Sequence, residues 1–146
     1  GGLELGRINI AARGAGMAKG ATDMALRYAM ERKTFGKPIA EHQAIQLKLA
    51  EMSTRAAAAE LLVRQAANKF DQGERCDLEA GQAKFFASES AVQNSLDAMR
   101  VFGGYSYSPE YEIERFYRDA PLLCIGEGTN EIQRMIIAKQ MVARTQ

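Results

Sequence analysis

The chain has 146 residues, 47% hydrophobic and 25% charged, a composition typical of one globular domain with a substantial core. Its 19 basic and 18 acidic residues nearly cancel, and no polybasic run occurs, which argues against nucleic acid or an anionic membrane as a partner. No apolar run approaches the ~20 residues of a membrane span. Two isolated cysteines and one histidine argue against a disulfide framework and a metal site, and favour ordinary reduced thiols.

Two long helices are predicted first. The first runs from Arg7 to about Arg32, with small and apolar residues three or four positions apart on one face. The second shows unbroken steps of four and three, the pattern of a helix in an antiparallel bundle, and Gly73 marks its end. The apolar positions are Ile8, Ala11, Ala15, Ala18, Ala21, Ala25 and Tyr28 in the first helix, and Ile45, Leu49, Met52, Ala56, Ala59, Val63, Ala66 and Phe70 in the second.

A third helix is predicted from Asp77, as N-cap, to Phe102, where a glycine pair stops it. Its apolar face carries Ala80, Ala83, Ala87, Ala91, Ala98 and Phe102. The segment 105–125 contains two prolines and is predicted as loop with a short helix around residues 110–117.

A fourth helix is predicted to begin near Asn130, where Asn130 and Gln133 fit a capping box. Its apolar positions are Ile132, Met135, Ile136 and Val142. No segment alternates with the period of a strand for long enough to predict a sheet. Long helices with short breaks predict an all-α fold, an up-down-up-down four-helix bundle forming a single domain over residues 1–146.

The irregular joints between these helices carry the candidate functional residues, and each also has a purely structural interpretation. In RKTFGKP (32–38), a glycine and a proline can simply stop a helix, whereas Arg32 and Thr34 suit a phosphate. A lone histidine such as His42 is more often exposed or capping than functional. In FGGYSY (102–107), the glycines either cap a helix or let a flat ring lie on the backbone.

The last joint, CIGEGTNEIQR (124–134), places Glu127 alone between two glycines, just before an amphipathic helix. Glycine on both sides removes steric bulk around the carboxylate, which suits a group that must reach into a cleft. From these residues alone, a catalytic role and a connecting role are about equally supported.

Four motifs in order resemble the C-terminal helical domain of acyl-CoA dehydrogenases: LGR (5–7), RKTFGKPIAEHQAI (32–45), GGYSY (103–107) and RDAPLLCIGEGTNEIQR (118–134). The resemblance covers essentially all 146 residues. It implies that an N-terminal helical domain and a middle β domain precede this bundle, so the chain, which opens without methionine, is expected to be a fragment. It also implies FAD as cofactor, bound between the β domain and bundle elements that include some from a neighbouring subunit.

The resemblance assigns roles residue by residue. Glu127 matches the base that removes the α-proton of an acyl-CoA thioester while hydride passes from the β-carbon to the flavin. Arg32, Lys33 and Thr34 match contacts to the pyrophosphate and ribose of FAD. The other matched positions are His42, Gln43, Gly103, Gly104, Thr129, Asn130 and Glu131 at the cofactor, and Glu4, Arg7 and Gly128 at the acyl-CoA site.

The resemblance therefore implies a flavin-dependent acyl-CoA dehydrogenase that passes electrons to an electron-transferring flavoprotein, in the bacterial cytoplasm or the mitochondrial matrix. Two alternatives stay open: an acyl-CoA oxidase that is reoxidised by oxygen, and a helical interaction module that has lost catalysis. The retained Glu127 and Arg-x-Thr-Phe motif argue against the latter. Gly126 stands where medium-chain relatives often carry Tyr, which leaves the acyl chain length open.

Assembly is expected through the helix faces, because alanine-rich seams pack closely and members of the family are dimers or tetramers. The isolated chain is expected to be inactive and to bind FAD weakly, since the β domain that the resemblance implies is not part of it.

Overall fold

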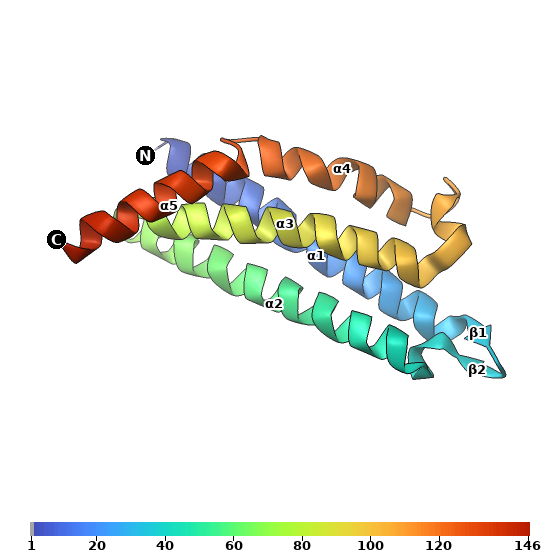
Figure 1. Ribbon diagram of the computed structural model, residues 1–146. Coiled ribbons are helices and arrows are strands. Elements are labelled where there is room, and N and C mark those ends of the chain that lie inside the picture. The colour runs from blue at the N-terminus through green and yellow to red at the C-terminus, as the bar shows by residue number, and fades with distance from the viewer. Residues whose placement is uncertain (1) are drawn as a thin grey trace.

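The structure is a computed structural model that describes residues 2–146, which form five α-helices and one very short hairpin (Figure 1). Strands β1 and β2 pair antiparallel, with Lys33 opposite Pro38 and Thr34 opposite Lys37. The elements are α1 (Gly2–Glu31), β1 (Lys33–Thr34), β2 (Lys37–Pro38), the 3-10 helix η1 (Ile39–Glu41), α2 (Gln43–Asp71), α3 (Asp77–Phe102), the 3-10 helix η2 (Gly103–Tyr107), α4 (Ile113–Ile125) and α5 (Asn130–Thr145).

The helices form an antiparallel bundle with a divided fourth position. Helices α1, α2 and α3 pack against one another and alternate in direction, while α4 and α5 follow each other along α3 (Figure 1). The predicted all-α, up-down-up-down four-helix bundle is confirmed, with the fourth helix broken at residues 126–129. Within residues 2–146, no helix is long and apolar enough to cross a bilayer.

The core between the first three helices is built mainly from alanine, as the predicted stripes require. Ala11, Ala18, Ala59 and Ala83 are fully buried, and larger residues such as Met52 fill the gaps between alanine layers. Small side chains let the backbones approach closely. A Cβ on Gly14 of α1 would lie 2.8 Å from the backbone carbonyl of Ala87 in α3, so only glycine fits there.

Two predicted helix starts differ from the structure by one residue. Cys76, not Asp77, occupies the N-cap of α3. Thr129, not Asn130, caps α5, and its hydroxyl accepts a hydrogen bond from the N–H of Ile132 at 3.4 Å. Both Thr and Asn are good N-caps. The side chain of Asn130 is instead drawn into the interior, where it bonds to α3.

The predictions for the fourth bundle position were wrong in two respects. Helix α4 continues through Pro121 to Ile125 instead of ending near residue 117, because Ile113, Ala120 and Leu123 all bury against the bundle. That packing outweighs the local preference against proline. Helix α5 leaves most of its predicted apolar positions exposed and buries two polar residues, Asn130 and Gln133.

Candidate functional site

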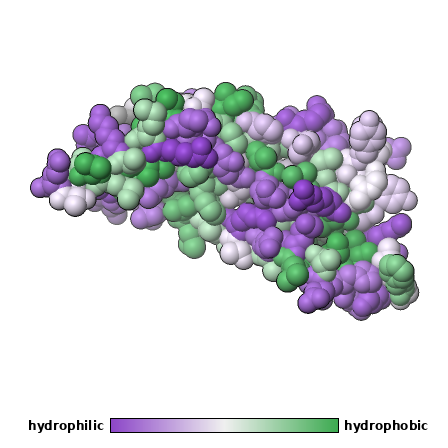
Figure 2. Space-filling view, viewed as in Figure 1, coloured by the Kyte–Doolittle hydropathy of each residue, from purple (hydrophilic) through white to green (hydrophobic). Residues whose placement is uncertain are grey.

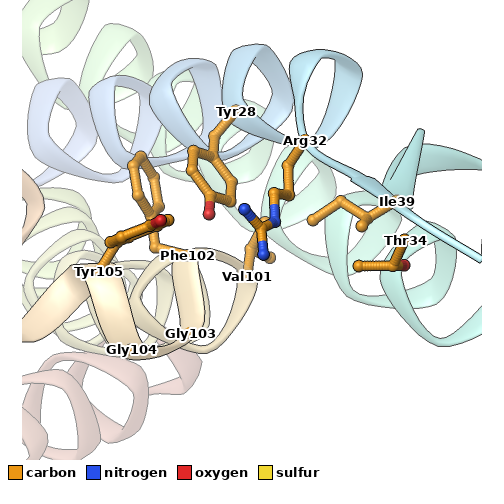
Figure 3. Close-up of a pocket in the computed structure, with 9 residues that line it drawn as sticks. All are labelled: Tyr28, Arg32, Thr34, Ile39, Val101, Phe102, Gly103, Gly104 and Tyr105. Carbon is orange, nitrogen blue, oxygen red and sulfur yellow. The ribbon is translucent and has the colours of Figure 1, made fainter.

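A pocket of about 550 Å³ opens where the end of α1 meets the end of α3 (Figure 3). It unites two joints that are far apart in sequence, the segment after α1 and the glycine pair after α3. The residues that line it are Tyr28, Arg32, Thr34, Ile39, Val101, Phe102, Gly103, Gly104 and Tyr105.

The cationic group of this pocket is Arg32. It follows the last residue of α1, and its backbone N–H still bonds to the carbonyl of Tyr28 at 2.9 Å. Its guanidinium extends into the pocket (Figure 3) with the central carbon 5.6 Å from the centroid of the Tyr105 ring. Arg32 is exposed and makes no ion pair with the part of the chain that the structure describes. A guanidinium with free donors is suited to bind phosphate oxygens.

The hairpin beside the pocket places Thr34 against His42. The turn between the strands uses positive φ at Phe35 (53°) and Gly36 (81°). Thr34 Oγ1 and His42 Nε2 are 2.9 Å apart, within hydrogen-bonding distance. His42 is the N-cap residue of α2 but makes no side-chain capping bond, so its ring orients the threonine instead. Lys33 and Gln43 are exposed on either side.

The glycine pair leaves the backbone bare at the edge of the pocket. Gly103 has a φ of +63°, which side chains rarely tolerate. A Cβ on Gly103 or Gly104 would meet no atom within 4 Å, so the backbone is open to a flat ligand. Behind it, Tyr28 and Phe102 stack with ring centroids 4.2 Å apart. An unpaired guanidinium, a hydroxyl and an open glycine backbone fit the diphosphate-bearing part of FAD.

The second candidate region is the loop between α4 and α5, which carries Glu127. Glu127 and Gly128 both have positive φ, +56° and +85°. The Glu127 side chain extends toward α1, where a Cβ on Gly6 would lie 2.8 Å from its carboxyl carbon. The absence of a side chain at Gly6 therefore provides the space that the carboxylate occupies.

Buried polar side chains of α3 and α5 bind the backbone carbonyls of this loop and of the end of α4. Lys84 of α3 donates to the carbonyls of Cys124 (3.1 Å) and Gly128 (2.9 Å). Gln133 donates to the carbonyls of Glu127 and Gly128, both at 3.2 Å. Lys84 is fully buried, and burial lowers the pKa of its ammonium. Sequence reasoning missed Lys84, because a lysine on an alanine-rich helix face carries no local signal that distinguishes it from a solvent-exposed one.

Exposed hydrophobic side chains surround the loop. Two of them lie in the last turn of α4, Leu122 (67% exposed) and Ile125 (61%). Ile132 of α5 and Leu3 and Leu5 of α1 are also exposed. Figure 2 shows hydrophobic surface on the upper edge of the molecule where α4 meets α5, and mostly hydrophilic surface farther along α4. Such a rim is typical of a surface that an apolar ligand or another domain covers.

The residues predicted for the acyl-CoA site face the bundle. Arg7 is buried, and its Nη1 lies 3.5 Å from Oδ1 of Asp77. Glu4 Oε1 accepts a hydrogen bond from the N–H of Cys76 at 2.9 Å. Both side chains thus meet the start of α3. Gly128 contributes its carbonyl to Lys84, and a role for these three residues at a substrate stays a prediction.

Residues 129–131, the turn predicted to contact the cofactor, have side chains in three different environments. Thr129 caps α5, and Asn130 is buried between α3 and α5. Glu131 is exposed in the first turn of α5, where hydrogen bonds from its own backbone N–H and from Thr129 lower the pKa of its carboxyl. Within residues 2–146, no cluster of His, Cys, Asp or Glu side chains could hold a metal ion.

The structure does not bring the two candidate regions together. Arg32 follows the C-terminal end of α1, whereas Gly6 and Glu127 lie near its N-terminal end (Figure 1). The 25 helical steps from Gly6 to Glu31 in one continuous helix correspond to about 38 Å at 1.5 Å per residue. One copy of the chain therefore cannot place Arg32 and Glu127 around the same reacting atoms.

Comparison with known proteins identifies the family to which the chain belongs. Residues 1–142 match the family described as acyl-CoA dehydrogenase, C-terminal domain. The chain is 50% identical over 143 residues to an acyl-CoA dehydrogenase of Bacillus subtilis, covering 98% of this chain and 38% of that protein. It is 43% identical over 142 residues to the caffeyl-CoA reductase-Etf complex subunit CarC of Acetobacterium woodii, covering 97% of this chain and 38% of that protein.

A solved structure of similar fold is the butyryl-CoA dehydrogenase of Megasphaera elsdenii. It superimposes with a TM-score of 0.94 at 41% identity, covering 96% of this chain and 37% of that one. The chain thus spans less than two-fifths of the length of these relatives.

Proposed function

The chain belongs to the acyl-CoA dehydrogenase family, and we propose that it is the C-terminal helical domain of an FAD-dependent enzyme that dehydrogenates an acyl-CoA between its α and β carbons. The observation that carries this proposal is Glu127, which stands in a left-handed backbone conformation with its carboxylate in the space left by Gly6. We further propose that an N-terminal helical domain and a middle β domain make up the rest of the enzyme.

The pocket residues would hold the cofactor. Arg32 would bind the diphosphate through its guanidinium, Thr34 would add a hydroxyl that His42 orients, and Gly103 and Gly104 would lie against the flat part of the molecule. Lys33, Gln43 and the turn of Thr129, Asn130 and Glu131 complete the proposed contacts. When bound, FAD supplies the acceptor for the hydride that leaves the β-carbon.

Glu127 would take the proton from the α-carbon. A general base must be able to approach the proton that it removes, and the flanking glycines leave room for the thioester beside the carboxylate. The backbone N–H of Glu127 would donate to the thioester carbonyl, where negative charge develops. The hydrophobic rim of Leu122 and Ile125 would exclude water once it is covered.

The distance between Arg32 and Glu127 supports a site shared by two copies. Since about 38 Å of helix α1 separates these regions in one chain, a complete site needs the Arg32 end of one copy and the Glu127 loop of another. A homodimer or a dimer of dimers satisfies this requirement.

We propose an electron-transferring flavoprotein as the electron acceptor, which is supported by the relative from Acetobacterium woodii that is named as part of such a complex. The relatives are bacterial, so of the two expected compartments we propose the bacterial cytoplasm. An acyl-CoA oxidase is the second candidate. Stopped-flow reoxidation of the reduced complete enzyme separates them, because rapid peroxide formation in air would identify an oxidase.

The base is tested by Glu127→Gln in the complete enzyme. This variant keeps the size of the side chain and removes its basicity, so flavin reduction by acyl-CoA is expected to slow by at least about 10²–10⁴-fold. FAD content and substrate affinity should be retained. Glu60→Gln, a change at an exposed carboxylate in the middle of α2, is the matched control. Flavin reduction at the normal rate in Glu127→Gln would place the base elsewhere.

A further inference from the structure

Lys84 is a lysine in the interior of the bundle, and its ammonium binds only uncharged oxygen atoms. Its side chain is fully buried on α3. The ammonium donates to the carbonyls of Cys124 and Gly128 and, at 2.8 Å, to Oδ1 of Asn130. These three bonds use all three donors of an ammonium group. None of the acceptors is a carboxylate, so Lys84 is not one half of a buried ion pair.

The three acceptors lie on both sides of Glu127 in the chain. Cys124 belongs to the last turn of α4, where free carbonyls make a negative pole that favours a cation. Gly128 follows Glu127 directly, and Asn130 is the first residue of α5. One buried ammonium thus ties the end of α4 to the beginning of α5 and spans the glutamate.

The backbone at Glu127 needs such support. A φ of +56° is unfavourable for a residue with a side chain, and it persists only where the surroundings hold it. Within the loop itself, Gly126 and Gly128 have no side chains to contribute. The bonds from Lys84 of α3 and Gln133 of α5 to the loop carbonyls are therefore the side-chain contacts that hold the segment in place.

Further hydrogen bonds fix the side chain of Asn130, one of the three acceptors of Lys84. Asn130 Nδ2 donates to Ser88 Oγ at 2.9 Å and to Glu89 Oε1 at 2.8 Å. Its amide is thereby oriented with the oxygen toward Lys84. An apolar side chain at position 84 could fill the same volume, but it would leave the carbonyls of Cys124 and Gly128 without this donor. The chemistry of the site, not its volume, requires a lysine.

We propose that Lys84 is a positioning residue for the catalytic base: it holds the loop from Cys124 to Asn130 so that the Glu127 carboxylate meets the substrate in one fixed orientation. This inference rests on the proposed role of Glu127. Lys84 touches neither substrate nor cofactor in this arrangement and acts only through the loop backbone.

The test is Lys84→Met in the complete, FAD-loaded enzyme, since methionine retains most of the volume and removes the donors. Asn94→Ala is the matched control. Asn94 is also fully buried on α3. Its Nδ2 donates to the carbonyls of Ala18 and Met52 and to the Thr22 hydroxyl, and its Oδ1 accepts a hydrogen bond from Arg55. It lies ten residues from Lys84 along the helix, about 15 Å.

Lys84→Met is expected to slow flavin reduction by acyl-CoA roughly 10–100-fold, because a displacement on the order of 1 Å is costly in a proton transfer. The dissociation constant for acyl-CoA should change less than threefold, and the isotope effect with α-deuterated substrate should rise as proton removal becomes limiting. Amide hydrogen exchange in residues 126–129 should accelerate in Lys84→Met and stay unchanged in Asn94→Ala.

A double variant separates this inference from the proposed function. In a Glu127→Gln background, Lys84→Met should add no further loss, because its effect passes through Glu127. An equal loss in both backgrounds, or a normal rate in Lys84→Met beside an inactive Glu127→Gln, would overturn the positioning role alone. A normal rate in Glu127→Gln would overturn both proposals. If Lys84→Met does not fold, Lys84→Gln, which keeps a shorter donor, is measured with the same expected and contrary outcomes.

Discussion

At the scale of single residues, the contact between Gly6 and Glu127 links the start of the first helix to the proposed base. Gly6 lies within α1, where glycine costs up to about 1 kcal/mol relative to alanine. The missing side chain has a use, because a Cβ there would lie 2.8 Å from the Glu127 carboxyl carbon. Helix stability therefore favours alanine at position 6, whereas placement of the Glu127 carboxylate favours glycine.

We expect Gly6→Ala to separate stability from activity. The variant should unfold at an equal or higher temperature, since alanine favours the helix by about 0.5–1 kcal/mol. Flavin reduction in the complete enzyme should nevertheless slow about tenfold or more, because the methyl group displaces the Glu127 carboxylate. Thermal unfolding and stopped-flow absorbance measure the two effects.

Gly16→Ala is the control for this prediction. Gly16 lies in the same helix, and a Cβ there would meet no atom within 4 Å. It should show the gain in stability with an unchanged rate of flavin reduction. Equal rates in both variants would show that the carboxylate does not need the space above Gly6.

At the scale of elements, α5 is attached to the bundle in an uncommon way. Much of its apolar side is exposed, and its C-terminal end is held by charge. Glu79 of α3 accepts two hydrogen bonds from Arg144 of α5, at 2.7 and 2.9 Å, and one from Lys69 of α2 at 2.7 Å. Glu79 is 5% exposed, so these bonds are little screened by solvent. One carboxylate thus joins three helices.

This attachment predicts a dependence of stability on acid. The hydrogen bond from Arg144, opposed by burial and supported by Lys69, lowers the pKa of Glu79 from 4.5 to about 2. Because the folded pKa is depressed, the stabilisation is fully present above the unfolded value near 4.5 and is lost as the pH falls toward 2. Its size is on the order of 3 kcal/mol, at 1.36 kcal/mol per pKa unit.

Glu79→Gln should therefore lower the free energy of unfolding at pH 6 and flatten its decline between about pH 5 and pH 2. Denaturant unfolding across this range measures both effects. Glu60→Gln, which removes an exposed ion pair with Arg64, should change stability by at most about 1 kcal/mol. A decline with pH as steep in Glu79→Gln as in the unchanged chain would rule out this carboxylate as its source.

At the scale of the whole molecule, the two candidate regions lie toward opposite ends of the bundle. The pocket of Arg32 lies at one end of α1 and the loop of Glu127 lies near the other, about 38 Å away along the helix. Each copy would thus lend a cofactor-binding end to one site and a catalytic loop to another. Assembly and activity would then be inseparable.

Mixed assemblies test this arrangement. Arg32→Ala and Glu127→Gln homo-oligomers of the complete enzyme should each be inactive. Random co-assembly makes half of the dimers mixed, and one of the two sites in each mixed dimer contains neither change. The unfractionated mixture should therefore regain roughly a quarter of the normal rate, and purified mixed dimers roughly half of it. Co-expression with two affinity tags and assay of the doubly purified protein measures this. No recovery in the mixed dimers would place Arg32 and Glu127 in the site of a single copy.

The sequence by itself determined the bundle and named the joints that carry the candidate functional residues. The alternation of alanine and larger apolar residues at steps of three and four dictates helices with one packing face, and the first three helices follow it closely. Local signals were weaker at the fourth position. Pro121 predicted a break that the burial of Ile113, Ala120 and Leu123 overrides, and the apolar side of α5 did not identify the face that packs.

Only the tertiary structure decided which joints meet. The spacing of hydrophobic residues describes each helix alone. The packing of the helices side by side decides three other features: Arg32 meets Gly103, both lie far from Glu127, and Lys84 is buried. A lysine on an alanine face cannot be distinguished from a solvent-exposed one until its acceptors are folded against it. These are carbonyls 40 and 44 residues later in the chain, at the end of α4 and in the loop that follows. Such contacts are set by packing between distant segments, which no local pattern of residues records.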